Sequence, residues 1–464
     1  MSSQNSLASA SEPDHASDQD GALGKGLRDI FRRVRRNTLT LAEPLTHEDW
    51  MLQSMEAASP IKWHLAHTSW FFETFVLAAF DQDYNCFHTD FSFLFNSYYQ
   101  QVGTMHRRDE RGLLSRPAAR DVLAYRAHVD AATEALLQTA LPEALAALAP
   151  LVTLGIAHEE QHQELMQTDI LHAFYQNRLL PAAYDDPASA SAPANAPGQG
   201  TGVPPGQIDG GPVGQSHDGA APHWIPFEGG LVEIGAGQAG FAFDNEYPRH
   251  KFWLNPFELA ADLVTNRDYL KFMAAGGYED PQYWLSDGWA LVQREGWRAP
   301  LYWQQLGDNG VWQQFGLFGA RPLDLEAAVR HVSYYEAAAY AAWAGAYLPT
   351  EIEWEVAAAA QDVDGRFLED GEPGHWRDRL SGARGPIRHL YGTVWEWTMS
   401  PYAAYPGYKP AGGAIGEYNG KFMSGQMVLR GGSSATPAGH VRATYRNFFP
   451  PDARWQMAGI RLAR

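Results

Sequence analysis

The segment His158-Glu159-Glu160-Gln161-His162 decides the fold of the first half of the chain. It lies inside a run compatible with a helix, expected from about Leu151 to Leu180, with Gly155 as the helix-breaking residue inside it. On a helix, residues four positions apart are neighbours on one face, with Cβ atoms about 5–6 Å apart. The two histidines can therefore bind one metal ion. A solvated polar helix face is the alternative, because an isolated pair with this spacing is common.

A second predicted helix adds further histidines. Ser59 suits its N-cap and Pro60 its first position, and His64 and His67 follow. Two antiparallel helices of a bundle can direct ligands toward a shared site. His64 and His67 are about one turn apart, so at most one of them need face the first helix, and residue chemistry does not choose between them. Three imidazoles without a thiolate suit zinc, iron or another first-row metal.

Composition limits the possible functions. The chain has 464 residues, 45% hydrophobic and 19% charged, which is typical of a globular protein with two or three domains. The formal charge of −19 argues against nucleic acid or an anionic membrane as the main partner. Cys86 is the one cysteine, so no internal disulfide can form and a reducing compartment is expected. Without a signal-peptide pattern or an apolar run of about 18 residues, a cytoplasmic location without a membrane partner is predicted.

Changes in composition divide the chain into four parts. We predict a disordered tail at 1–22, a metal-binding helical bundle at 23–180, a flexible linker at 181–222 and an irregular α+β domain at 223–464. Helical periodicity near Gly24, the two histidine-bearing helices and Asp121–Leu137 together fit a four-helix bundle.

The second domain carries a set of short motifs: Gly229–Gly235, Asn245–His250, Val264–Tyr269, Val332–Ala337, Leu348–Glu355, Gly392–Thr398, Leu429–Ser434 and Gly459–Leu462. Together they resemble the formylglycine-generating-enzyme (sulfatase-modifying-factor) domain, which has a C-type-lectin-like fold. That domain lacks cysteine here, so formylglycine formation is not expected. The first half resembles the DinB type of metal-binding four-helix bundle. In this order, the two halves resemble the iron-dependent sulfoxide synthases of ergothioneine biosynthesis.

The resemblance implies both the reaction and the metal ligands. Members of the family join a sulfur donor to the imidazole C2 of N-α-trimethylhistidine (hercynine), using O2, and produce a sulfoxide. Their bundle motif corresponds to Leu65-Ala66-His67 and to the segment from His158 to His162. The resemblance thus implies that His67, His158 and His162 bind iron(II), with O2 as co-substrate, and that His64 packs the helices or supports a ligand.

Substrate contacts are implied in the same way. Gln161 matches a glutamine that hydrogen-bonds the substrate imidazole. Asn447, Phe448 and Phe449 match an asparagine and two aromatics that receive the carboxylate and the quaternary nitrogen. A trimethylammonium group has no N–H to donate, so aromatic faces are its natural partners. Two core phenylalanines are the alternative.

The catalytic phenol is expected from Tyr98 and Tyr99, which match a Tyr-Tyr pair of the cysteine-using branch. A phenol can deliver a proton to reduced oxygen. In the other branch the tyrosine comes from the second domain, where Tyr402 and Tyr405 are the candidates. Packed interface tyrosines are the alternative for the first pair.

The sulfur donor remains open between cysteine, which the Asn-Ser-Tyr-Tyr segment favours, and γ-glutamylcysteine. Arg108 and Arg111 lie near the spacing of an arginine pair that binds donor carboxylates, with a surface ion pair as the alternative. Asp452 is a candidate partner for the donor amine. Rival functions are 5-histidylcysteine sulfoxide synthesis, metal-dependent thiol transfer, and pure ligand binding with a structural zinc.

Overall fold

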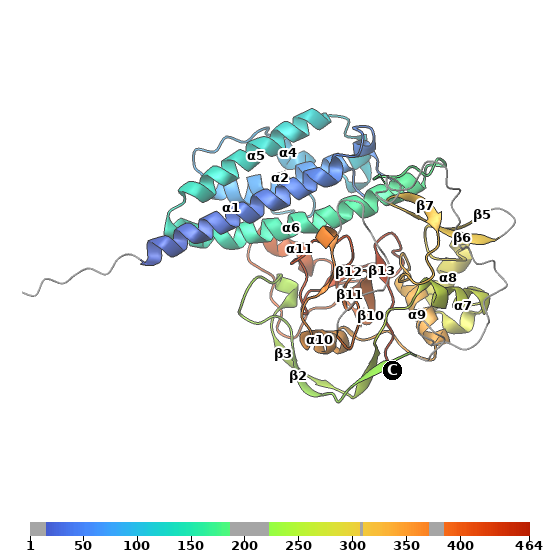
Figure 1. The fold of residues 1–464 in the computed structure, drawn as a ribbon. Helices are drawn as coiled ribbons and strands as arrows, with labels where there is room; N and C mark the ends of the chain where they lie inside the picture. Colours follow the sequence, from blue (N-terminus) through green and yellow to red (C-terminus); the bar gives the residue numbers. More distant parts are fainter. Residues whose placement is uncertain (1–14, 186–221, 307–309, 371–384) are drawn as a thin grey trace, which may run out of the picture.

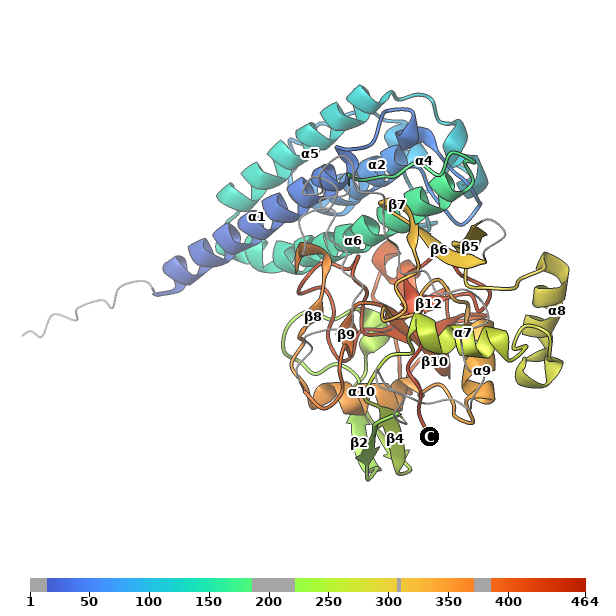
Figure 2. The ribbon, with the colours of Figure 1, turned by 45° about the vertical axis from the view of Figure 1, so that its right-hand side comes forward.

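The computed structural model describes residues 15–185, 222–306, 310–370 and 385–464. They form a helical unit followed by a unit built from small sheets and short helices (Figure 1). Helix α6 lies on the side of the helical unit that faces the second unit in both ribbon views (Figures 1 and 2). Residues 1–14 of the predicted tail and 186–221 of the predicted linker lie outside the described residues.

Four long helices form the first unit, as the periodicity predicts: α1 (His15–Ala42), α2 (Ile61–Phe72), α5 (Ala119–Thr139) and α6 (Pro142–Tyr175). A π-helical turn, Glu73–Leu77, and α3 (Ala78–Phe80) continue α2, and the short α4 (Phe91–Leu94) follows. Helix α1 thus begins inside the range assigned to the tail. Helix α1 packs against α5 and α6, and α2 packs against the same two helices.

Helix α6 is longer at its N-terminus than predicted. It begins at Pro142, not at Leu151, and ends at Tyr175 before the expected Leu180. Proline in a helix interior removes one hydrogen bond and costs about 3 kcal/mol. Pro150 is exposed and lies within the helix all the same. The helix continues through it because Leu145, Leu148 and Val152 are buried in the core on either side.

The second unit contains thirteen described strands: β1 (Trp224–Phe227), β2 (Gly230–Ile234), β3 (His250–Leu254), β4 (Phe257–Ala260), β5 (Trp303–Leu306), β6 (Val311–Gly316), β7 (Gly319–Pro322), β8 (Gly365–Arg366), β9 (Tyr391–Gly392), β10 (Trp395–Pro401), β11 (Met427–Arg430), β12 (Asn447–Phe449) and β13 (Ala458–Gly459). The largest sheet has the order β12-β11-β10-β13, with β13 parallel to β10 and the other pairs antiparallel. This sheet carries Trp395, which bonds Glu164 of α6, and the strand Asn447–Phe449.

The helices of this unit are α7 (Asn266–Ala274), α8 (Ser286–Glu295), α9 (Tyr334–Trp343), α10 (Glu351–Ala359) and α11 (Glu417–Gly420). The sequence runs from Thr265 to Ala275 and from Ser333 to Ala346 predict two helices, and α7 and α9 lie within these runs. Each begins with a capping box, in which Thr265 or Ser333 bonds the backbone N–H three residues on.

The two units share a core. One cluster of buried apolar residues joins the bundle to Tyr302, Phe315, Ala435 and Met457 of the second unit. Apolar side chains of both units are therefore buried together at their junction. Among the described helices, none combines the length and apolar character that a bilayer crossing needs.

Gly155 provides a test of this packing. A Cβ at this position would lie 2.6 Å from Cε1 of Phe72 and 3.0 Å from Cε1 of Phe71, two buried rings of α2. We expect Gly155→Ala to lower the free energy of unfolding by about 1–3 kcal/mol through overpacking, despite the better helix propensity of alanine. Urea denaturation measures the change.

The matched control is Gly26→Ala in α1, where an added Cβ meets nothing within 4 Å. We expect this exposed change to be neutral or stabilising by up to about 1 kcal/mol. Equal effects of the two substitutions would contradict the packing argument.

Candidate active site

The structure brings His67 of α2 together with His158 and His162 of α6. Each offers one ring nitrogen, and these nitrogens lie within 4.8 Å of one another. All three side chains are buried. His158 and His162 are on one face of α6 because they are four residues apart, as the sequence indicates.

Hydrogen bonds orient two of the three rings. Nδ1 of His67 donates to the carbonyl oxygen of Phe95 at 2.6 Å. Nε2 of His64 lies 3.1 Å from the Asp169 carboxylate, and Nδ1 of His64 lies 2.7 Å from Nδ1 of His162. Because the carboxylate accepts from Nε2–H of His64, the other nitrogen of His64 accepts from Nδ1–H of His162. Both ligand rings thus keep a lone pair on Nε2, the arrangement that metal-bound histidines require.

The trio fits a divalent metal. Burial lowers the pKa of His67 and His162 and lowers that of His158 to about 4, so the three rings are neutral at neutral pH and can act as metal ligands. The Nε2 atoms of His158 and His162 are 3.1 Å apart. Two lone pairs at this distance repel each other unless a cation or a proton lies between them. Three neutral imidazoles match the ligands that first-row metals prefer.

Aromatic stacking holds His67 in place. Its ring stacks on Trp63 and Trp70, with ring centroids 4.4 and 5.4 Å away. The guanidinium carbon of Arg111 lies 3.5 Å from the centroid of the Trp63 ring. Arg111, Trp63, His67 and Trp70 therefore form one stack that fixes the plane of the His67 ring.

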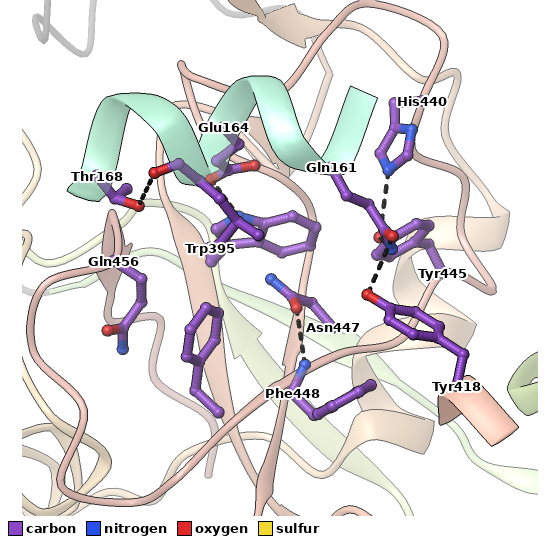
Figure 3. A pocket seen from close by; sticks show the side chains of 12 residues that line it. Gln161, Glu164, Thr168, Trp395, Tyr418, His440, Tyr445, Asn447, Phe448 and Gln456 are labelled. Atoms are coloured by element: carbon purple, nitrogen blue, oxygen red, sulfur yellow. Dashed lines mark hydrogen bonds between the residues drawn. The ribbon is translucent and has the colours of Figure 1, made fainter. Parts of the chain in front are cut away.

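A cavity of about 120 Å³ lies at the junction of the two units (Figure 3). Its lining combines aromatic rings with amide, carboxylate and imidazole groups: Gln161, Glu164, Leu165, Thr168, Trp395, Tyr418, His440, Tyr445, Asn447, Phe448, Phe449 and Gln456. Four predicted substrate residues, Gln161, Asn447, Phe448 and Phe449, are thus brought together. Asp452 is exposed and is not among the lining residues.

Tyr418 is a lining residue that sequence reasoning missed. It lies on α11, its hydroxyl donates to Oε1 of Gln161 at 3.2 Å, and its ring centroid is 6.2 Å from that of His158. The named alternatives lie elsewhere. Tyr402 stacks on Phe448 and accepts from Asn245, and the hydroxyl of Tyr405 accepts from Arg430. Nothing in the local sequence distinguishes Tyr418 from the other tyrosines of the second domain.

The predicted tyrosine pair occupies two environments. Tyr98 is half-buried, accepts a hydrogen bond from Nη1 of Arg108 at 2.5 Å, and lies 6.3 Å from the Tyr418 ring. Tyr99 is buried against Trp70 and Phe75, and burial raises the pKa of its phenol. Tyr98 therefore lies beside Tyr418, which is close to His158, and Tyr99 packs against Trp70, which stacks on His67.

Arg108 and Arg111 have no ion pair with a carboxylate among the described residues. Arg111 donates to the hydroxyls of Ser59 and Ser97, and burial lowers its pKa to about 9. Arg108 donates to the carbonyl oxygens of Glu56 and Ala57. The surface ion pair that was the alternative for these arginines is not formed in the described part of the chain. The structure leaves two guanidinium groups without a charge partner there.

Glu164 anchors the cavity wall and was also missed. Its carboxylate accepts from Trp395 Nε1 at 2.7 Å, Ser433 Oγ at 2.6 Å and Thr436 Oγ1 at 2.7 Å, all from the second unit. The helical spacing could have shown that Glu164 lies one turn after Glu160, but its partners are about 230–270 residues away.

The sequence matches known proteins along nearly its whole length. Residues 30–166 match the DinB superfamily, and residues 211–464 match the sulfatase-modifying factor enzyme 1-like domain. The chain is 32% identical to a hercynine oxygenase of Mycolicibacterium smegmatis, over 94% of this chain and 98% of that protein. The chain belongs to the hercynine oxygenase family.

Two further hercynine oxygenases are similar to this chain. The protein of Mycolicibacterium thermoresistibile is 32% identical over 66% of this chain and 67% of its own length. That of Mycobacterium tuberculosis is 36% identical over 50% of this chain and 58% of its own length. As a hercynine oxygenase family member the chain is an oxidoreductase, with a DinB-like bundle and a sulfatase-modifying-factor-like second domain, as the sequence motifs indicate.

Iron(II) titration tests the histidine cluster. We expect His158→Ala to abolish stoichiometric binding, because two imidazoles remain. We expect His64→Leu to weaken binding about 10- to 100-fold, because His162 loses the group that orients it. His128→Leu is the matched control, since His128 is exposed and contacts the carbonyl oxygen of Asn85. Unchanged affinity in His64→Leu would contradict the role given to His64 and Asp169.

Proposed function

We propose that the protein is an iron(II)- and O2-dependent sulfoxide synthase that joins cysteine to C2 of hercynine and forms hercynylcysteine sulfoxide. The observation that carries the proposal is the three-histidine cluster beside a cavity lined by Gln161, Asn447 and two phenylalanines. Relatives named for oxygenation of hercynine support it.

The cavity chemistry suits hercynine, which carries an imidazole, a carboxylate and a quaternary ammonium group. Phe448 and Phe449 offer aromatic faces to the quaternary nitrogen, and the Glu164 carboxylate adds negative charge. The Asn447 amide can donate to the carboxylate, and Gln161 can bond the imidazole.

The thiol donor would bind near the histidine cluster at the side where Arg108 and Arg111 lie. Arg108 and Arg111 lack a carboxylate partner among the described residues, so they can bind the donor carboxylate. One carboxylate fits cysteine, and the second carboxylate of γ-glutamylcysteine could engage the other guanidinium. The exposed position of Asp452 gives no support to a contact with the donor amine.

The proposed reaction balances without an outside reductant. A C–H bond of hercynine and the S–H bond of cysteine break, a C–S bond forms, and the sulfur gains one oxygen atom. O2 accepts four electrons, two from C–S formation and two from sulfur oxidation, and its second oxygen atom leaves as water. When bound, iron(II) would supply the site for O2 activation. His67, His158 and His162 would hold the ion, and the nearby phenols would supply a proton to reduced oxygen.

Three other functions use parts of the same site. 5-Histidylcysteine sulfoxide synthesis would couple cysteine to unmethylated histidine. The α-ammonium group of histidine has N–H donors that call for hydrogen-bond acceptors, whereas a trimethylammonium group has none and suits aromatic faces. Metal-dependent thiol transfer would need no O2. Pure ligand binding with a structural zinc would show no turnover with iron. The aromatic cavity favours the sulfoxide synthase over these three.

The deciding experiment supplies iron(II)-loaded protein with hercynine and either cysteine or γ-glutamylcysteine, under air and under argon. We expect, with cysteine under air alone, a product whose mass equals both substrates minus two hydrogens plus one oxygen. The same product from γ-glutamylcysteine alone would keep the chemistry and change the donor. No product with either donor would contradict the proposal, and O2-independent thiol transfer would replace it.

The three phenols can be separated by single Phe substitutions. We expect Tyr99→Phe and Tyr418→Phe each to lower kcat about 10²-fold or more, because each substitution removes a hydroxyl that would deliver a proton to reduced oxygen. We expect Tyr98→Phe mainly to raise the KM for the thiol, because the Tyr98 hydroxyl bonds Arg108. Stopped-flow and steady-state kinetics measure both parameters. Retention of kcat within threefold in all three variants would remove the phenols from the mechanism.

A further inference from the structure

A chain of four hydrogen bonds crosses the junction of the two units, and Figure 3 shows four of its five side chains. The Tyr418 hydroxyl lies 3.2 Å from Oε1 of Gln161, and Nε2 of Gln161 lies 2.8 Å from the Tyr445 hydroxyl. The Tyr445 hydroxyl lies 3.2 Å from Nε2 of His440, and Nδ1 of His440 lies 3.0 Å from the Glu160 carboxylate. Glu160, His440 and Tyr445 are buried.

Counting protons gives this chain one direction. The Glu160 carboxylate accepts, so Nδ1 of His440 carries the hydrogen and Nε2 of His440 has the lone pair. That lone pair accepts a hydrogen bond from the Tyr445 hydroxyl. The Tyr445 oxygen then accepts from the Gln161 amide, and the Gln161 carbonyl accepts from Tyr418.

The direction matters because an amide has two different ends. If nothing accepted the Tyr445 proton, that hydroxyl could donate to Gln161 instead. The Gln161 amide would then satisfy both tyrosines equally well when rotated by half a turn. Its NH2 group, rather than its oxygen, would face Tyr418 and the cavity that both residues line.

We propose that His440 and Glu160 are positioning residues that set the direction of this chain and present the Gln161 carbonyl oxygen to the N–H of the substrate imidazole. The inference rests on the proposed function, since it requires an imidazole substrate. It deepens that function by explaining how a glutamine selects the protonated ring nitrogen.

The chemistry of the substrate makes the direction consequential. An imidazole that binds a metal through one nitrogen has a hydrogen on the other nitrogen. A carbonyl oxygen has two lone pairs, so the Gln161 oxygen can accept from Tyr418 and from the substrate at once. An amide NH2 in the same place would set two donors against each other and leave both unsatisfied.

The test is hercynine binding to the iron(II)-loaded protein, measured by calorimetry without thiol and without O2. We expect His440→Leu and Tyr445→Phe each to weaken binding about tenfold, and the double variant to lose no more than either single one, because both act through one chain. Iron content should stay unchanged. His250→Leu is the matched control, since His250 bonds Pro248 and lies outside the chain.

The same His440→Leu substitution made in a Gln161→Glu variant tests the direction of the hydrogen-bond chain. In Gln161→Glu both side-chain oxygens accept hydrogen bonds. The substrate N–H therefore meets an acceptor whether or not the His440 imidazole is present. We expect His440→Leu to change hercynine affinity less than threefold in this background. An equal loss in both backgrounds, or losses that multiply in the Tyr445–His440 double variant, would show a merely structural role and overturn the inference.

Failure of the two proposals can be told apart. If the wild-type protein does not bind hercynine, the proposed function falls and this inference falls with it. If the wild type binds hercynine and His440→Leu binds it equally well, the positioning role alone is overturned.

Discussion

Helix α6 is enclosed on every side near the active site, and the rest of the structure depends on this constraint. Successive residues of a helix point about 100° apart, so each polar side chain between 158 and 164 meets a different surrounding. Glu159 and Gln163 bond α1, and Glu159 also bonds Arg126 of α5. His158 and His162 meet His67. Glu160, Gln161 and Glu164 bond the second unit. A rotation of α6 would break all three sets at once.

The Glu159 carboxylate fixes this rotation inside the bundle. It is fully buried, and Arg35 and Arg126 lower its pKa to about 2. Buried ion pairs often add little net stability, because desolvation offsets attraction, but an unmatched partner is costly. The arginines of α1 and α5 therefore specify one orientation of α6, and with it the direction of the neighbouring His158 of the histidine cluster.

The second unit supplies walls rather than metal ligands. Its largest sheet carries Trp395 and the Asn447–Phe449 strand, helix α11 carries Tyr418, and a loop carries His440. Neither unit alone forms the cavity, and the two share a buried core at the junction. This arrangement explains how a scaffold without cysteine can serve oxidation chemistry: a metal site on the neighbouring bundle would carry the reaction, and the lectin-like domain would select the substrate.

The sequence by itself determined what depends on short spacing. The four-residue separation of His158 and His162 gives their common face, and capping residues such as Thr265 and Ser333 locate helix starts. The motif match also named Gln161, Asn447 and the two phenylalanines of the cavity. The start of α6 was misplaced because tertiary packing outweighs the local cost of Pro150. Glu164, Tyr418, His440 and the direction of the Gln161 amide came from tertiary structure alone. Their partners across the junction are more than 200 residues away in sequence, and no local pattern records which side chains meet when two domains pack.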